Sequence, residues 1–101
     1  MKLRPSVCLE CISGDMTGNI LEFMGFQSTV LLYGLLSDKP AGNINTIGFI
    51  GKAQTIESFL LNNYLAKKTL TEYLEIVLKA EGMYRNELKT QVNARYGLHQ
   101  I

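Results

Sequence analysis

The sequence lacks the features that mark several large classes of protein. It has no apolar run long enough to span a bilayer, and it does not open with the basic, apolar and small-residue succession of a signal peptide. Ten basic and nine acidic residues leave a net charge of only +1, so we expect neither a membrane nor a nucleic-acid partner. Only two cysteines are present, and without a secretion signal they favour a reducing, intracellular compartment, either cytoplasmic or mitochondrial.

What remains is the composition of an ordinary globular protein. Of the 101 residues, 47% are hydrophobic and 19% are charged. No internal repeat or low-complexity segment divides the chain. This length supports one small hydrophobic core, so we predict a single domain over residues 1–101.

The apolar run within segment 28–34 predicts the central strand of a sheet. A strand with one face in water alternates apolar and polar residues, and this one does not, so helices should cover both of its faces. Segment 35–42 then forms a loop at the carboxyl end of that strand. In open α/β sheets this is where ligands bind.

Segment 6–12 predicts a second strand. The residues between the two strands have one apolar helical face, with Ser13 or Asp15 as the expected N-cap and Gly25 just after the helix end. Strand, helix and strand with short connections form a βαβ unit with parallel strands. The sequence therefore predicts the α/β fold class.

The middle of the chain predicts two further elements. A short helical turn is expected around residues 44–50, and residues 54–61 form a third strand that ends in a turn at 62–63. Polar residues alternate with apolar ones at the start of this third strand. It should therefore lie at the edge of the sheet.

The last third of the chain contains the clearest helix signal. Thr69 and Glu72 have the spacing of a capping box, and Gly82 is expected to end the helix that follows. Beyond it, residues 88–92 predict a short strand and residues 98–101 the start of another helix. This part of the sequence predicts structure but no chemistry.

Spacing alone identifies no active site. Cys8 and Cys11 match C-x-x-C, but residues three apart on a strand point to opposite faces, and His99 is the only histidine that a zinc site has available. We therefore predict two free thiols and no metal. Glu10 is expected to accept hydrogen bonds from backbone groups at its strand end rather than act as a base. The glycine-bearing segment 14–18 matches neither phosphate-loop consensus.

Five short motifs, taken together, resemble one family. They are Leu9-Glu10-Cys11-Ile12-Ser13-Gly14, Leu32-Tyr33-Gly34-Leu35-Leu36-Ser37, Phe49-Ile50-Gly51-Lys52, Ile56-Glu57-Ser58-Phe59-Leu60-Leu61 and Leu88-Lys89-Thr90. Their order resembles the zinc-type (medium-chain) alcohol dehydrogenase superfamily, in its quinone oxidoreductase-like branch, which includes enoyl reductases. The resemblance runs from about Ser6 to Ile101. It implies half of a Rossmann fold, the C-terminal half of an NAD(P)-binding domain, with three mainly parallel strands and covering helices.

The resemblance also implies a cofactor-binding edge built from three segments. The turn after the first strand lies beside the cofactor, the end of the central strand lines the nicotinamide, and the end of the third strand offers backbone groups to its carboxamide. The implied residues are Cys11, Ile12, Ser13, Tyr33, Gly34, Leu35, Ser58, Phe59 and Leu60. All three segments follow parallel strands, where ligands are expected. No catalytic residue and no metal ligand is implied.

The resembled family has parts that these 101 residues do not match. Its glycine-rich turn, its ribose-reading residue and its catalytic domain have no counterpart here. NADP or NAD should therefore bind in an intact family member but not tightly to this chain. The expected function is part of the cofactor-binding domain of an NAD(P)H-dependent quinone oxidoreductase or alcohol dehydrogenase-like reductase, inactive by itself. The alternative is a non-catalytic structural or interaction subunit derived from such a dehydrogenase.

The absent first half also bears on the expected partners. In the full strand order, the strand over residues 6–12 pairs with a strand of that first half. Without it, both edges of the sheet offer unpaired backbone groups and one face lacks its full helical cover. We expect self-association, or binding to a host protein, through the edge strand 54–61.

Overall fold

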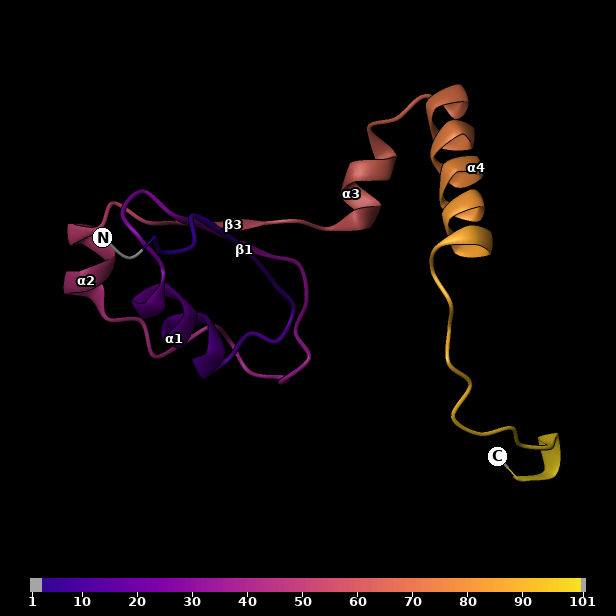
Figure 1. Ribbon diagram of the computed structural model, residues 1–101, viewed down its shortest axis with the longest axis horizontal. Coiled ribbons are helices and arrows are strands. Elements are labelled where there is room, and N and C mark those ends of the chain that lie inside the picture. The colour runs from indigo at the N-terminus through magenta and orange to yellow at the C-terminus, as the bar shows by residue number, and fades with distance from the viewer. Residues whose placement is uncertain (1–2, 101) are drawn as a thin grey trace. The chain divides into compact units, whose positions relative to one another are not determined.

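The structure, a computed structural model, describes residues 3–100, and the chain divides into two compact units, one up to Tyr64 and one from Leu65. The first unit contains β1 (Val7–Glu10), α1 (Asp15–Phe23), β2 (Thr29–Leu32), α2 (Thr46–Gly51) and β3 (Thr55–Ser58), as Figure 1 shows. Helix α3 (Leu61–Ala66) spans the boundary, and the second unit contains α4 (Leu70–Asn86) and a 3-10 turn, η1 (Leu98–Gln100). The sheet thus belongs entirely to the first unit.

The three strands form one parallel sheet in the order β1-β2-β3. This confirms the predicted α/β half-Rossmann fold, with β2 at the centre and β3 at an edge. Each strand has four residues, so the predicted strands 6–12, 28–34 and 54–61 are all too long. Their apolar ends leave the sheet because residues 11–13 form a turn and α3 begins at residue 61.

The core of the first unit lies on one face of the sheet. Leu21 and Met24 pack there with Val30 of β2, and all three side chains are at most 2% exposed. The same face presents Cys8 and Ile56, which pair in register with Val30 across the sheet. Phe49 of α2 and Ile20 of α1 also pack against this cluster, so both helices cover this one face.

No helix among the described residues of the first unit packs against the opposite face of the sheet. Successive strand residues alternate between faces, and Val7 and Leu9 of β1 are 64% and 67% exposed. Leu31 of the central strand is half-buried on that side. Within the described residues of the first unit, helices cover β2 on one face only. That helices cover both faces of β2, and that one face of the sheet lacks its full helical cover, both stay predictions.

The C-terminal end of α1 is held by residues around the start of β3. The Lys52 ammonium donates to the carbonyls of Leu21, Glu22 and Met24 at 3.4, 2.7 and 3.2 Å. These carbonyls have no partner within the helix, and the positive charge suits the negative end of the helix dipole. The Gln54 amide donates to the Leu21 carbonyl at 2.8 Å as well. The helix ends with Met24 as C-cap, directly before Gly25 as predicted.

Helix α4 begins as the sequence predicts and ends later. The Thr69 hydroxyl accepts from the Glu72 N–H at 3.2 Å, and the Glu72 carboxylate accepts from the Thr69 N–H at 2.8 Å, which completes the capping box. The backbone hydrogen bond from Thr69 holds the pKa of Glu72 below its ordinary value.

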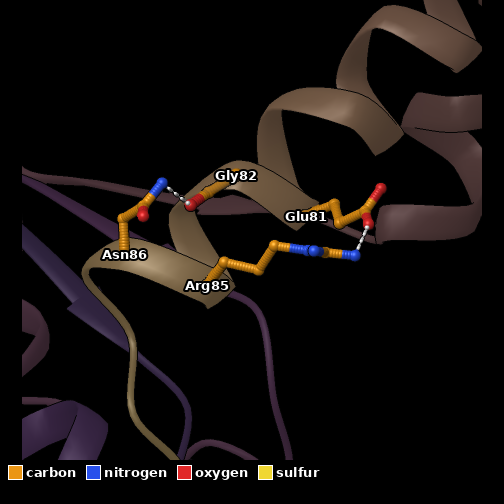
Figure 2. Close-up of polar contacts among 4 residues, drawn as sticks. All are labelled: Glu81, Gly82, Arg85 and Asn86. Carbon is orange, nitrogen blue, oxygen red and sulfur yellow. Dashed lines mark hydrogen bonds and ion pairs between the residues drawn. The ribbon is translucent and has the colours of Figure 1, made fainter.

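The prediction that Gly82 ends α4 is wrong, because the helix continues to Asn86. In its last turn the Asn86 amide donates to the Gly82 carbonyl at 2.9 Å, and the Arg85 guanidinium lies 2.7 Å from the Glu81 carboxylate (Figure 2). Both contacts satisfy or support the end of the helix. A glycine inside a helix costs only about 1 kcal/mol relative to alanine, which the rest of this helix tolerates.

Two predicted elements near the ends of helices are also absent from the described part of the chain. The turn expected at residues 62–63 lies inside α3, and residues 88–92 form no strand. A strand needs a partner, and the second unit provides none among its described residues. Within residues 3–100, no helix is both long and apolar enough to cross a membrane.

Candidate functional site

The three segments implied as a cofactor edge lie together at the carboxyl end of the sheet. Tyr33 donates its N–H to the Glu10 carbonyl at 3.0 Å, and Phe59 donates its N–H to the Leu32 carbonyl at 3.0 Å. These two hydrogen bonds extend the pairing of neighbouring strands by one residue, beyond the ends of β2 and β3. The turn 11–13, the turn 33–35 and residues 58–60 therefore follow neighbouring parallel strands side by side.

Glu10 organises the first of these turns. Its carboxylate is 3% exposed and accepts hydrogen bonds from the N–H groups of Ile12 and Ser13, the latter at 2.7 Å, and from the Thr17 hydroxyl at 2.7 Å. Burial alone raises the pKa of Glu10, but the bonds from Thr17, Ser13 and Ile12 outweigh it and hold the pKa below 4.5. The expectation that Glu10 caps backbone groups at its strand end is confirmed.

This arrangement makes the first unit sensitive to acid. Because the pKa of Glu10 is lower in the folded state, its stabilisation is complete above pH 4.5 and is lost as the pH falls through the folded pKa. Glu10→Gln should lower the free energy of unfolding at neutral pH by about 1–3 kcal/mol. The difference from the wild type should shrink as the pH falls to about 3.

Urea unfolding followed by the NMR signals of β2 measures this effect. Glu57→Gln is the matched control, because Glu57 lies on β3 with its side chain exposed. If Glu10→Gln and Glu57→Gln lower the free energy of unfolding equally at neutral pH, the stabilising role assigned to the Glu10 hydrogen bonds is contradicted.

The loop after β2 folds back onto the start of α1. Gly14 donates its N–H to the Lys39 carbonyl at 3.2 Å, and Gly42 donates its N–H to the Gly14 carbonyl at 3.0 Å. Gly18 donates its N–H to the Gly42 carbonyl at 3.1 Å. The amino-terminal end of α1 is thus occupied by carbonyl groups of the protein itself.

The N-cap of α1 is Gly14, and the prediction of Ser13 or Asp15 is wrong. Ser13 and Gly14 both have positive φ, of 64° and 63°. Gly14 has no side chain, so the helix start has no side-chain cap. The Ser13 hydroxyl instead points into the interior. It is buried and has no hydrogen-bond partner among the described residues.

These contacts decide how the site fits a dinucleotide. A pyrophosphate needs free backbone N–H groups at a helix start. At α1 the N–H groups of Ile12, Ser13, Gly14 and Gly18 all donate within the protein. The N–H groups of Ile12, Ser13 and Gly14 in the turn before α1 are therefore not available to a phosphate, although the turn lies at the carboxyl edge where the resemblance implies a cofactor neighbour.

The β2 and β3 side of the same edge has a different character. Leu35 and Leu60 are 56% and 57% exposed, and Phe59 packs its ring against Tyr64 with centroids 5.7 Å apart. A hydrogen bond with the Cys11 side chain raises the pKa of the half-exposed Tyr33 hydroxyl. Tyr33 therefore stays neutral at physiological pH. An apolar rim with one neutral hydroxyl fits an aromatic ring, such as nicotinamide, better than it fits a phosphate.

The residues implied for the cofactor edge differ in how closely they contact one another. Gly34 packs against the turn after β1, because a Cβ built on it would lie 2.6 Å from the Cys11 carbonyl oxygen. Leu36 and Ser37 add N–H bonds to the Cys11 and Ile12 carbonyls at 3.0 and 2.8 Å. The segment 58–60 is connected to the end of β2 by the hydrogen bond from the Phe59 N–H to the Leu32 carbonyl. The loop over residues 36–43 lies at this edge, where the sequence places a loop at 35–42, and the hydrogen bonds of Leu36 and Ser37 hold it against the turn after β1.

The thiols Cys8 and Cys11 are separate in the structure. Cys8 lies in β1 on the core face and Cys11 follows the strand, and both are free and half-buried. Within residues 3–100, no three histidine, cysteine, aspartate or glutamate side chains gather as a metal site would require. The zinc-free state of the chain stays a prediction.

Comparison with known proteins finds likeness in structure only. No protein-family profile and no curated protein sequence matches the chain. A structure described as an NADPH:quinone reductase from Mesorhizobium loti matches with a TM-score of 0.67 and 19% identity over 89% of this chain. A mutant of Etr1p in complex with NADP and crotonyl-CoA matches with a TM-score of 0.69 and 21% identity over 89% of it.

A third structure is the mitochondrial 2-enoyl thioester reductase Etr1p/Etr2p heterodimer from Candida tropicalis. It matches with a TM-score of 0.67 and 21% identity over 91% of this chain. The chain spans only 24–26% of the length of these three proteins. At these identities the likeness establishes the fold, and it confirms at that level the resemblance inferred from the five motifs.

Proposed function

We propose that this chain is the C-terminal part of the cofactor-binding domain of an NAD(P)H-dependent reductase of the quinone oxidoreductase-like branch. The observation that supports this most directly is the carboxyl edge of the parallel sheet, where Tyr33, Leu35 and Phe59 form an apolar rim on adjacent strand ends. The solved structures similar to this chain include one described as an NADPH:quinone reductase and one in complex with NADP.

The residues of this chain would act on the nicotinamide end of the cofactor. Leu35, Phe59 and Leu60 exclude water from one face of the ring, the neutral Tyr33 hydroxyl offers a hydrogen bond, and backbone groups at 58–60 hold the carboxamide. The bound cofactor supplies the hydride, and the acceptor would be a carbonyl or an activated alkene. We expect another part of the protein to hold the phosphates, because the N–H groups of Ile12, Ser13, Gly14 and Gly18 around the start of α1 all donate within this chain.

The isolated 101-residue chain should therefore bind NADPH and NADH no tighter than about millimolar and should not oxidise them with quinones or enones. Isothermal titration calorimetry with each nucleotide measures the binding, and absorbance of the reduced nicotinamide measures turnover. Saturable binding in the micromolar range would contradict the occupied helix start.

The second candidate is a non-catalytic interaction subunit derived from such a reductase. The observation that favours it is that β3 is an edge strand of the sheet, with Thr55, Glu57 and Ser58 exposed. We propose that this edge pairs with a second copy or a host protein. Thr55 and Phe59 donate their N–H groups inward to β2, so by alternation the Ser58 N–H points to the free edge.

The variant Ser58→Pro removes this outward donor and leaves the β2 pairing intact, so it should shift a self-associated chain toward monomer. Sedimentation velocity at micromolar concentration measures the shift. Glu57→Pro is the control, because the Glu57 N–H faces β2 by the same alternation, and it should unfold the edge instead. A wild-type chain that sediments as a stable, folded monomer would end this proposal.

A further inference from the structure

A cavity of about 260 Å³ lies between the C-terminal end of α1 and helix α2. It is next to the start of β3, whereas the candidate cofactor edge lies at the carboxyl ends of the strands. None of the residues implied for that edge lines the cavity. The lining combines apolar surface from Leu21 and Phe49 with polar side chains from Glu22, Asn45, Lys52 and Gln54.

The Gln54 side chain presents an unpaired acceptor to this cavity. Gln54 is only 8% exposed, and its amide nitrogen donates to the carbonyls of Leu21 and Gly25 at 2.8 and 3.4 Å. Because carbonyls only accept, the nitrogen must face them, and the amide oxygen faces the other way, toward the cavity that Gln54 lines. No donor among residues 3–100 bonds to the Gln54 oxygen, so a ligand that donates would give it a partner.

The charges around the cavity favour a neutral ligand. All three N–H groups of the Lys52 ammonium donate to carbonyls at the end of α1, so Lys52 offers a ligand no bond, and its charge disfavours a cation. The Glu22 carboxylate and the Gln54 oxygen disfavour an anion. The Asn45 amide donates one N–H to the Glu22 carboxylate at 3.5 Å, which leaves its second N–H for an acceptor.

We propose that this cavity binds a small neutral molecule that carries a primary carboxamide or a lactam. The N–H of the ligand donates to the Gln54 oxygen, its carbonyl accepts from the Asn45 amide, and its apolar body lies against Leu21 and Phe49. Pockets for drug-sized ligands have volumes of about 300–1,000 Å³, so this cavity suits a smaller molecule of about one substituted ring. The inference goes beyond the proposed function, because the cavity and the cofactor edge are at opposite ends of β3.

Benzamide is the probe, because it joins one apolar ring to a primary carboxamide. Titrating it into the isotope-labelled 101-residue chain should shift the NMR signals of the Gln54 side-chain amide and the Gly48 N–H saturably, with a Kd of about 1 mM. N,N-dimethylbenzamide keeps the ring and the carbonyl but has no N–H, benzoate is an anion and benzylamine is a cation. Each of these three should bind at least about tenfold more weakly than benzamide.

A matched pair of glycine variants in α2 tests the location. Gly48 lines the cavity, and a Cβ built on it lies 3.5 Å from the Asn45 amide nitrogen, an ordinary contact, so the side chain of Gly48→Leu takes up space in the cavity. Gly51→Leu is the control, because Gly51 is in the same helix, does not line the cavity, and a Cβ there meets nothing within 4 Å. Gly48→Leu should weaken benzamide binding at least about tenfold and Gly51→Leu less than about twofold.

A single ordered water is the competing occupant, since it also supplies a donor to the Gln54 oxygen. Shifts that do not saturate, or equal affinity for benzamide and N,N-dimethylbenzamide, would leave the water as the occupant and overturn the inference. Shifts confined to the Tyr33 and Gly34 signals would overturn it too, because they place benzamide at the cofactor edge. If Gly48→Leu does not fold, the four-ligand series on the wild-type chain decides alone. The nucleotide titrations of the proposed function concern the other end of β3, so their outcome leaves this inference standing.

Discussion

Replacing Gly18 with alanine is expected to push the loop 36–43 away from α1 and to destabilise the first unit by about 1–3 kcal/mol. A Cβ at this position would lie 2.0 Å from the Asn43 carbonyl oxygen and 2.5 Å from the Gly42 carbonyl oxygen. These are backbone atoms, which cannot rotate aside as a side chain does. The same shift breaks the 3.1 Å bond from the Gly18 N–H to Gly42.

Native-state hydrogen exchange measures this effect separately in each unit. Gly82→Ala is the matched control, because Gly82 also lies inside a helix and a Cβ there meets nothing within 4 Å. It should stabilise α4 by about 0.5–1 kcal/mol, since alanine loses less backbone freedom on folding than glycine does. Equal protection of the β1 and β2 amides in the wild type and in Gly18→Ala would contradict the loop contact.

The sequence predicts the order of the elements well, because that order follows from local patterns. The apolar run at 28–34, the helical periodicity before it and the Thr69 capping box each depend on residues close together in the chain. The structure has β2, α1 and α4 at these positions. Local patterns also place α2, which is capped by the Asn45 side chain.

The ends of the elements were predicted less well, and the reason is physical. Cys11, Ile12 and Leu60 are apolar, so they extend the predicted strands, but they lie in irregular segments beyond the last paired residues. Gly82 has the composition of a helix end and sits inside α4, where the last turn gains bonds from Asn86 and Arg85. Composition does not distinguish an apolar strand from an apolar turn at the end of one.

The candidate site shows the same division. The turns after the strands could be located from the sequence because parallel strands end at one edge of the sheet. The sequence could not show that N–H groups around the start of α1 are engaged. Gly14 and Gly18 donate to the carbonyls of Lys39 and Gly42, which lie more than twenty residues away in the chain. The spacing of the two glycines was the only local signal, and it matched no known phosphate loop.

The Leu21→Ala variant is expected to have the largest effect in the chain, a loss of about 2–5 kcal/mol in the free energy of unfolding of the first unit. Leu21 is 2% exposed, and with Met24 and Val30 it forms the buried hydrophobic cluster of the described residues. Small domains are only about 5–15 kcal/mol stable in all, so this loss should leave a large fraction of the sheet unit unfolded at room temperature.

The change acts on packing alone, because the Leu21 carbonyl that accepts from Gln54 at 2.8 Å belongs to the backbone and is retained. Ile47→Ala is the control, since Ile47 is 86% exposed, and it should stay within about 0.5 kcal/mol of the wild type. Urea unfolding monitored through the NMR signals of β2 should show the Leu21→Ala midpoint far below that of the control. The remaining buried cluster has too few side chains to fill the cavity that Leu21→Ala leaves. Coincident midpoints for Leu21→Ala and Ile47→Ala would therefore show that contacts outside this cluster stabilise the sheet.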